Sequence, residues 1–209
     1  MIVERAREFL TGSLVELEPV EERHREELAA AAASSPESFR FFTLDLSRPE
    51  NFAAWFRRAL EAGERPFATR LRESGGLVGS SWLMTHVPEH RRIEIGNTWV
   101  VTSAWGSGVN TEAKLLMLEH AFERLGVRRV EFKTEATNGR SCAALAALPA
   151  QFEGIHRNHM LVRGGENRDS AWYSVIEEEW PEVRAALRAR VQDAASRSSA
   201  ASSSPGSST

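Results

Sequence analysis

The chain has 209 residues, of which 42% are hydrophobic and 26% are charged, and its formal net charge is −3. This composition is ordinary for a globular protein, and the length allows a full hydrophobic core. The net charge argues against a general nucleic-acid or membrane-surface binder, because neutralising phosphates requires concentrated Lys and Arg. The single cysteine, Cys142, excludes an intrachain disulfide and fits a reducing compartment.

Neither end of the sequence has the pattern of a membrane segment. Charged residues interrupt the apolar ones between Met1 and Leu14, so no signal peptide is expected there, and no later stretch has membrane-spanning length. Residues 194–209 are almost entirely Ser and Ala, a composition that favours disorder. We therefore expect a cytoplasmic protein with a single domain over residues 1–193 and a disordered tail over residues 194–209.

The first half of the chain alternates helix and strand patterns. We expect a strand at Leu14–Glu18, a helix over Glu21–Ala33, and a second helix from about Ser47 to Gly63. The second helix places apolar residues on one face, at Phe52, Trp55, Phe56 and Leu60. Turn residues then separate three predicted strands, at Pro66–Leu71, Leu77–Val87 and Arg92–Val101.

The second half begins with the strongest helix pattern in the sequence, over Asn110–Leu125. After it we expect a strand at Val127–Thr134, a short helix at Gly139–Leu148, strands at Phe152–Val162 and Ala171–Glu177, and a closing helix over Pro181–Val191. This order predicts an α+β or α/β domain with a mixed sheet, whose central strand-helix-strand unit is right-handed.

The segment from Thr98 to Lys114 carries the strongest functional signal, because it combines a strand, a loop with two glycines and a long helix. Amides at a helix start have no partners within the helix, and the helix dipole adds partial positive charge. Gly106 and Gly108 lack the Cβ atoms that would keep an anion away from those amides. The pattern predicts an anion site, although a tight turn followed by an Asn or Thr helix cap would have the same appearance.

Two common phosphate-binding motifs do not fit this loop. There is no Gly-Lys-Ser/Thr, as a nucleotide-triphosphate P-loop requires. Thr111 occupies the third glycine position of a dinucleotide fingerprint counted from Gly106.

The residues from Trp105 to Asn110 instead resemble the coenzyme A motif of the GNAT N-acetyltransferase superfamily, Gln/Arg-x-x-Gly-x-Gly/Ala. Trp105 stands where Gln or Arg is usual, Asn110 where Gly or Ala is usual, and Pro149 where relatives usually have Gly. Features of the branch that contains the ribosomal-protein N-terminal (alanine/serine) acetyltransferases recur in order along the chain, at 14–19, 76–79, 94–96, 128–130, and at Asn138 with Ser141.

The resemblance implies a mixed, mostly antiparallel sheet flanked by helices, with a central strand-loop-helix-strand unit that binds acetyl-CoA as co-substrate. It implies transfer of an acetyl group to a primary amine, on a protein N-terminus or a small molecule, by direct attack in a ternary complex. It also implies a monomer or homodimer with no metal, nucleic-acid or membrane partner. By the same resemblance the backbone of Trp99, Val100 and Val101 binds pantetheine, and Asn138 touches the pantetheine or acetyl end. The diphosphate is held by the amides of Gly106, Ser107, Gly108, Val109 and Asn110, with Trp105 and Thr111 also in the coenzyme site.

Each of these coenzyme contacts has a plainer alternative. Trp99 and Val101 could serve only the core, and Asn138 could only cap the following helix. The acceptor pocket is expected between the first two helices and the late strands, where several aromatic residues either line it or belong to the core: Phe39, Phe41, Phe42, Trp55 and Trp172.

Two side chains are candidates for proton transfer. Glu94 alternates out of phase with its apolar strand neighbours and is the candidate base, or else a solvated or salt-bridged strand glutamate. Ser141 is by resemblance the acid that protonates the leaving thiolate, or else a hydroxyl at a helix start. By analogy the amide of Val101 would be the oxyanion donor. Tyr173, the only tyrosine, lies in a late strand and has little support as the acid.

No metal site is expected from the histidines, because alternation along the strand places His156 and His159 on opposite faces. Two other functions stay open at this point. The chain could bind acyl-CoA as a sensor or scaffold without chemistry, or it could bind a nucleotide phosphate.

Overall fold

The computed structural model describes residues 8–61 and 64–202. Over these residues an eight-stranded sheet runs in the order β1-β2-β3-β4-β5-β6-β8-β7. Only β5 and β6 pair in parallel; every other neighbouring pair is antiparallel. The strands are β1 Leu10–Thr11, β2 Val15–Pro19, β3 Arg65–Leu71, β4 Leu77–Val87, β5 Arg92–Val100, β6 Arg129–Glu135, β7 Gln151–Val162 and β8 Glu166–Ile176. The predicted mixed, mostly antiparallel sheet is confirmed.

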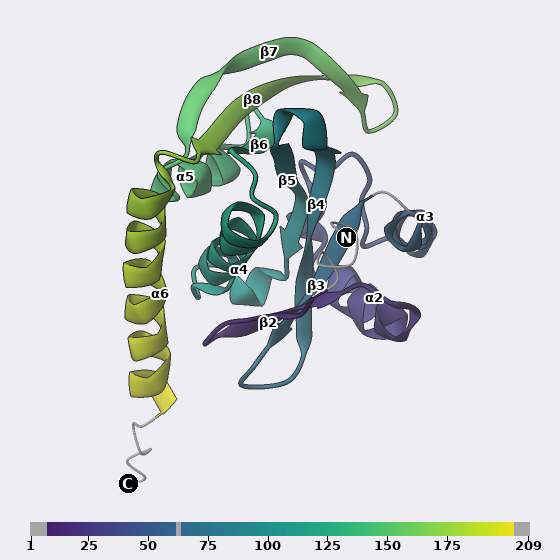
Figure 1. Ribbon diagram of the computed structural model, residues 1–209. Coiled ribbons are helices and arrows are strands. Elements are labelled where there is room, and N and C mark those ends of the chain that lie inside the picture. The colour runs from purple at the N-terminus through teal and green to yellow at the C-terminus, as the bar shows by residue number, and fades with distance from the viewer. Residues whose placement is uncertain (1–7, 62–63, 203–209) are drawn as a thin grey trace, which may run out of the picture.

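Helices cover both faces of the sheet (Figure 1). Helices α2 (Arg25–Ala33) and α3 (Pro49–Leu60) lie on one side, and α4 (Val109–Glu119) and α6 (Trp180–Ser202) lie on the other. The short helix α5 (Gly139–Ala147) follows β6, and the long β7–β8 hairpin arches over that end of the molecule. Within the described ranges, no helix is both long enough and apolar enough to cross a bilayer.

Short helical turns account for several differences from the sequence prediction. The helix predicted from Glu21 begins as a 3-10 turn, and the one predicted over Asn110–Leu125 ends as a π-helical turn, His120–Arg124. The two-residue strand β1 is too short for alternation to reveal it. Leu60 was expected on the buried face of α3 but is 43% exposed, because it is the last residue of the helix.

The closing helix is longer than predicted. It was expected to end near Val191, with a disordered tail from residue 194, but α6 continues to Ser202, so the expected domain boundary at 193/194 falls inside a helix. Alanine favours helix, and Val191 and Ala194 are buried against the rest of the domain. Packing therefore stabilises a segment whose composition alone suggested disorder. Residues 203–209, the rest of the predicted tail, lie outside the described residues.

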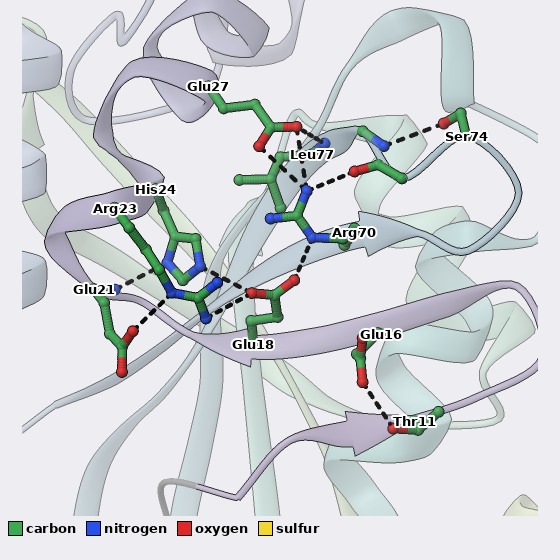
Figure 2. Close-up of polar contacts among 12 residues, drawn as sticks. Thr11, Glu16, Glu18, Glu21, Arg23, His24, Glu27, Arg70, Ser74 and Leu77 are labelled. Atoms are coloured by element: carbon green, nitrogen blue, oxygen red, sulfur yellow. Dashed lines mark hydrogen bonds and ion pairs between the residues drawn. The ribbon is translucent and has the colours of Figure 1, made fainter.

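A network of charged side chains fixes the start of α2 to the sheet (Figure 2). The buried carboxylate of Glu18 on β2 lies 2.9 Å from His24 Nε2 and also accepts a hydrogen bond from Arg70 on β3. Because His24 Nδ1 accepts from the amide of Glu21, Nε2 holds the ring proton and donates to Glu18. Arg70 also contacts Glu27 of α2, whose Oε1 accepts the amide of Leu77 at 2.7 Å. These contacts join α2 to three neighbouring strands.

The two parallel strands separate soon after they meet. Residues Arg92–Glu94 of β5 pair with Arg129–Glu131 of β6, and no later pair forms between the two strands in the described chain. On the other edge of β5, the register against β4 shifts near Gly96, and Asn97 has a left-handed φ of 47°. The rest of β5 therefore presents a free backbone edge, beside which the loop before α4 begins.

Candidate active site

A cavity of about 700 Å³ opens where β5 and β6 separate. Its walls come from the free edge of β5, the loop before α4, and the start of α5. The β7–β8 hairpin, the segment after Ser38 and the last turns of α6 complete it. It is lined by most of the residues that the sequence indicated: Glu94, Trp99, Val100, Trp105, Gly106, Gly108, Asn110, Thr111, Asn138 and Ser141.

The loop before α4 supplies unpaired backbone amides to this cavity. Helix α4 begins at Val109, and its N-cap residue, Gly108, offers no side chain as a cap. Within the described chain, no acceptor is found for the amides of Gly106, Gly108, Asn110 and Thr111. All four residues line the cavity, and an Asn or Thr cap, the plainer explanation of the sequence pattern, is not formed. Their amides and the helix dipole provide the predicted environment for an anion.

The residues between these four face elsewhere. The amide of Ser107 donates to the carbonyl of Ala104 at 3.4 Å, and that of Val109 donates to the Ser107 hydroxyl at 3.4 Å. Ser107 and Val109 line a separate depression on the side of Ser13 and Leu14. The left-handed φ of Gly106 (75°) and Gly108 (91°) turns alternate peptide groups to opposite sides. The amides of Ser107 and Val109, which the sequence analysis assigned to the diphosphate, thus have partners within the loop, and both residues lie outside the cavity.

The amide of Val101 is also used within the protein. It donates to the carbonyl of Val78 on β4 at 2.8 Å, so the predicted oxyanion donor is occupied here, and Val101 does not line the cavity. In an antiparallel ladder, neighbouring residues direct their peptide groups to opposite edges. The amide of Val100 therefore faces the free edge of β5, and it replaces Val101 as the backbone donor of this wall.

Trp105 has two roles that its position in the motif does not reveal. Its indole Nε1 donates to the Val100 carbonyl at 3.0 Å, which ties the loop to β5. The guanidinium carbon of Arg140 lies 3.4 Å from the centroid of the Trp105 ring, in a cation–π contact between the loop and α5. Trp105 thus holds a cation beside the amides, although it is itself uncharged.

Asn138 and Ser141 lie at the start of α5. The side-chain oxygen of Asn138 accepts the amide of Ser141 at 3.2 Å, so Asn138 is a helix cap as well as a cavity residue. The Ser141 hydroxyl has no hydrogen bond within the described residues and lines the cavity. It is therefore available to a ligand. Tyr173, the alternative acid, does not line the cavity.

Glu94 is buried in the wall of the cavity and forms an ion pair. Its Oε2 lies 2.9 Å from Lys133 Nζ on β6 and 3.4 Å from the Thr85 hydroxyl. Lys133 also lies over the ring of Trp172, at 5.4 Å. The ion pair holds the carboxylate in one orientation and leaves Oε1 without an ion-pair partner.

Lys114 is a buried amine that the sequence analysis did not single out. It lies on α4, and its Nζ donates to Ser81 Oγ at 2.9 Å and Thr98 Oγ1 at 2.5 Å, with no ion pair to any described carboxylate. Burial lowers the pKa of Lys114 to about 7. The helix pattern did not indicate that Lys114 is buried, because its burial depends on packing against Ser81 of β4 and Thr98 of β5.

Replacing Lys114 with methionine is expected to remove a rise of stability at alkaline pH. The unfolded chain binds the lysine proton below about pH 10.4, but the folded protein binds it only below about 7. Between these values the unfolded state holds more protons, so stability rises with pH, by about 3 kcal/mol from pH 7 to 9.5. Urea unfolding at both pH values measures the rise. An equal rise in Lys114→Met would contradict this explanation.

The histidine prediction is wrong in one respect. His156 and His159 were expected on opposite faces of β7, but their rings lie 5.7 Å apart and both pack against Trp172. A bulge between His156 and Met160, with Asn158 at φ 52°, interrupts the alternation. No group of three or more His, Cys, Asp or Glu residues in the described part of the chain could hold a metal ion.

The last turns of α6 supply further residues to the cavity that the sequence analysis assigned to a tail or to a plain closing helix. Arg190, Asp193, Ala194 and Arg197 line it together with Arg140 and the loop. Arg190 also donates to the Ala147 carbonyl at the end of α5. Three arginines against one aspartate make this part of the cavity suitable for phosphate groups.

Comparisons with known proteins agree with this architecture. Residues 15–150 match the family model described as an acetyltransferase (GNAT) domain. A GCN5-related N-acetyltransferase from Brucella melitensis is 32% identical, with a TM-score of 0.83 over 88% of this chain and 86% of that one. A search among curated proteins gave no match.

Two more distant structures share the fold. A protein from Vibrio cholerae described as a "putative ribosomal-protein-serine acetyltransferase" is 19% identical, with a TM-score of 0.68 over 81% of this chain and 97% of that one. A spermidine N-acetyltransferase from Vibrio cholerae, solved with CoA and spermine, is 13% identical, with a TM-score of 0.67 over 81% of this chain and 99% of that one. With the family model matching well over half of its length, the chain belongs to the GNAT family and is an N-acetyltransferase.

Proposed function

We propose that this protein transfers the acetyl group of acetyl-CoA to a primary amine by direct attack within a ternary complex. The observation that supports this most directly is a single cavity that joins four unpaired amides at a helix start to a buried carboxylate and an available hydroxyl. The acceptor is a protein N-terminus or a small-molecule amine.

The amides of Gly106, Gly108, Asn110 and Thr111 would hold the diphosphate of coenzyme A. They fit this group because they face one cavity, lack partners in the described chain and lie at the positive end of α4. Arg140 and Arg190 would neutralise the remaining phosphate charge. The Val100 amide on the open edge of β5 would donate to the pantetheine arm, while the Val100 carbonyl already accepts from Trp105 and Ser38.

Acetyl-CoA supplies an activated thioester, so the protein needs to orient the amine, remove its proton and protonate the departing thiolate. Ser141 would give its hydroxyl proton to the sulfur and take a proton back from solvent, since its hydroxyl lines the cavity and has no partner among the described residues. Asn138 fixes the backbone of Ser141 by capping α5. The Val100 amide would polarise the thioester carbonyl in place of Val101.

Glu94 would accept the proton from the amine, either directly or through a water molecule. An α-amino group with a pKa of roughly 7.7–8.0 is about one-tenth neutral at pH 7, so a weak base is sufficient. A lysine side chain near 10.4 is neutral in only about one molecule in 2,500, a handicap of roughly 4.6 kcal/mol. The ion pair with Lys133 holds the Glu94 carboxylate in a fixed orientation in the cavity wall. The arrangement is better matched to acceptors with the lower amine pKa.

Removing the two proton-transfer groups is expected to slow turnover without weakening coenzyme binding. With an accepted amine, Ser141→Ala should lower kcat by about 10- to 100-fold and Glu94→Gln by about 100-fold, because positioned acids and bases contribute about 10²–10⁴-fold. Thiol release measures turnover, and calorimetry measures CoA affinity.

Two results would decide against this mechanism. Full turnover in both variants would show that neither group transfers a proton. Tight CoA binding without thiol release, over a panel of peptides, amino acids and polyamines, would favour a sensor or scaffold that binds acyl-CoA without chemistry.

A further inference from the structure

Arg168 is a buried cation in the wall of the active-site cavity. It forms no ion pair with any carboxylate in the described part of the chain. It lies on β8, opposite Met160 on β7, and only 9% of it is exposed. Its side chain makes one hydrogen bond within the described chain, from Nε to the Ser170 hydroxyl at 3.2 Å. The terminal nitrogens therefore have no acceptor from the described residues, yet the residue lines the cavity.

The nearest carboxylates already have partners. Glu94 and Glu135 both act on Arg168 electrostatically, but neither forms an ion pair with it. Glu94 pairs with Lys133 at 2.9 Å, and Glu135 pairs with Arg163 at 2.9 Å. Of these residues Glu94, Lys133 and Arg168 line the cavity, so this wall contains one balanced ion pair and one additional positive charge.

The guanidinium of Arg168 is also held in place. The buried Ser170 hydroxyl accepts from Arg168 Nε and lies 2.9 Å from His159 Nδ1. Burial, together with the neighbouring cations Lys133 and Arg168, lowers the pKa of His159, so its ring is neutral and can accept the hydroxyl proton on Nδ1. His159 in turn packs on Trp172. Such support favours the binding of a specific group.

The terminal nitrogens of Arg168 are open to the cavity, where an anionic group of a ligand can pair with the guanidinium. We propose that the acceptor of this enzyme is a primary amine that also carries a carboxylate, and that Arg168 binds this carboxylate while the amine lies toward Glu94. The inference rests on the proposed acetyl transfer and names the class of its acceptor.

Charge and geometry favour a carboxylate over other ligand groups. A planar carboxylate matches the two parallel N–H bonds that a guanidinium offers. One negative charge balances the charge of Arg168, whereas the second charge of a phosphate would add to the repulsion by the nearby Glu94 and Glu135. A polyamine would add positive charge beside Arg168. The carboxylate could belong to a free amino acid or to an acidic residue at a peptide N-terminus.

Matched acceptors test this assignment. The first comparison is between free amino acids and the corresponding amino acid amides, with kcat/KM expressed per neutral amine because the α-amino group of the free acid has the higher pKa. The second is between C-terminally amidated tripeptides that begin with Asp or Glu and those that begin with Asn or Gln, and it distinguishes the two sources of the carboxylate. We expect kcat/KM to be about 10- to 100-fold higher for the acid in at least one comparison, as for hydrogen bonds to charged groups.

Substitution then attributes the preference to Arg168. In Arg168→Met, kcat/KM for the acid should fall about 10- to 100-fold while that for the amide stays within about threefold, and Arg168→Lys should recover part of the loss. Arg157→Met is the matched control, because Arg157 is an exposed arginine on the same hairpin that does not line the cavity. CoA affinity and the thermal unfolding midpoint show whether each variant is folded.

The outcomes separate this inference from the proposed function. Equal rates on acids and amides, a preference for amides or spermidine, no turnover of any acid by the coenzyme-bound enzyme, or an unchanged preference in Arg168→Met would overturn the inference. Acetyl transfer to amides or to spermidine would leave the proposed function standing. Failure of the wild-type protein to bind CoA by calorimetry would overturn the proposed function itself.

Discussion

Replacing Glu112 with alanine is expected to lower the free energy of unfolding by about 4 kcal/mol. Glu112 lies in the first turn of α4 with 3% exposure, and it accepts four hydrogen bonds from the turn before β2. Oε1 accepts the amide and the hydroxyl of Ser13 at 2.7 and 2.6 Å, and Oε2 accepts the amides of Leu14 and Val15 at 2.6 and 2.7 Å. Alanine would leave these donors without an acceptor, and each buried donor left unsatisfied costs about 1–3 kcal/mol.

Glu119→Ala is the matched control for this effect. Glu119 ends the same helix, and its contact with Arg188 of α6 lies nearer the surface. A surface ion pair contributes about 0–1 kcal/mol, so this variant should lose no more than that. Guanidinium-induced unfolding of both variants provides the comparison. If Glu112→Ala lost no more stability than Glu119→Ala, the four hydrogen bonds would not be the main link between α4 and the β2 turn.

Replacing Gly108 with valine is expected to weaken CoA binding by more than about 100-fold. Gly108 has a φ of 91°, where a β-branched residue is strained. A Cβ there would lie 2.5 Å from the Cβ of Ala194 and 3.1 Å from Cδ1 of Leu14, closer than packed atoms come. The loop would have to move, and its amides would no longer face the same point. Calorimetry with CoA measures the loss.

Gly126→Val separates backbone strain from the effect on the loop. Gly126 also has a left-handed φ, 65°, but nothing lies within 4 Å of a Cβ at that position, and it follows the π-helical turn rather than the coenzyme loop. This variant should lose stability and keep its CoA affinity. Wild-type affinity in a folded Gly108→Val protein would show that the loop does not hold the coenzyme.

Local patterns predicted several of the elements that form the cavity wall. Strand β4 has the predicted limits, Leu77–Val87, because turn residues bound an apolar run on both sides. Gly106 and Gly108 indicated the loop, because two glycines directly before a helix allow left-handed φ angles and leave the first helix amides accessible. The sides on which Ser107 and Val101 lie could not be predicted, since they depend on the φ angles of the loop and on the register with β4.

Residues whose role depends on distant contacts were not found. Arg168 and Lys114 are ordinary charged residues in their own elements, and only the folded sheet shows that they are buried without a carboxylate partner. The bulge in β7 likewise brings the rings of His156 and His159 together, although regular alternation along the strand would place them on opposite faces. The Ser- and Ala-rich composition predicted disorder from residue 194, but α6 continues to Ser202, and its residue Ala194 packs against Gly108.

The contact between Ala194 and Gly108 has a consequence for the order in which the protein matures during synthesis. Leu14, Gly108 and Ala194 meet at one point, although they come from the beginning, the middle and the end of the described chain. A nascent chain emerges from its N-terminus and folds as units become complete. The strands and α4 can assemble while the chain is still being made, but the coenzyme loop gains its last neighbour only when the final helix has been translated. Competence to bind the coenzyme would therefore arise only after α6 has emerged, when most of the sheet is already in place.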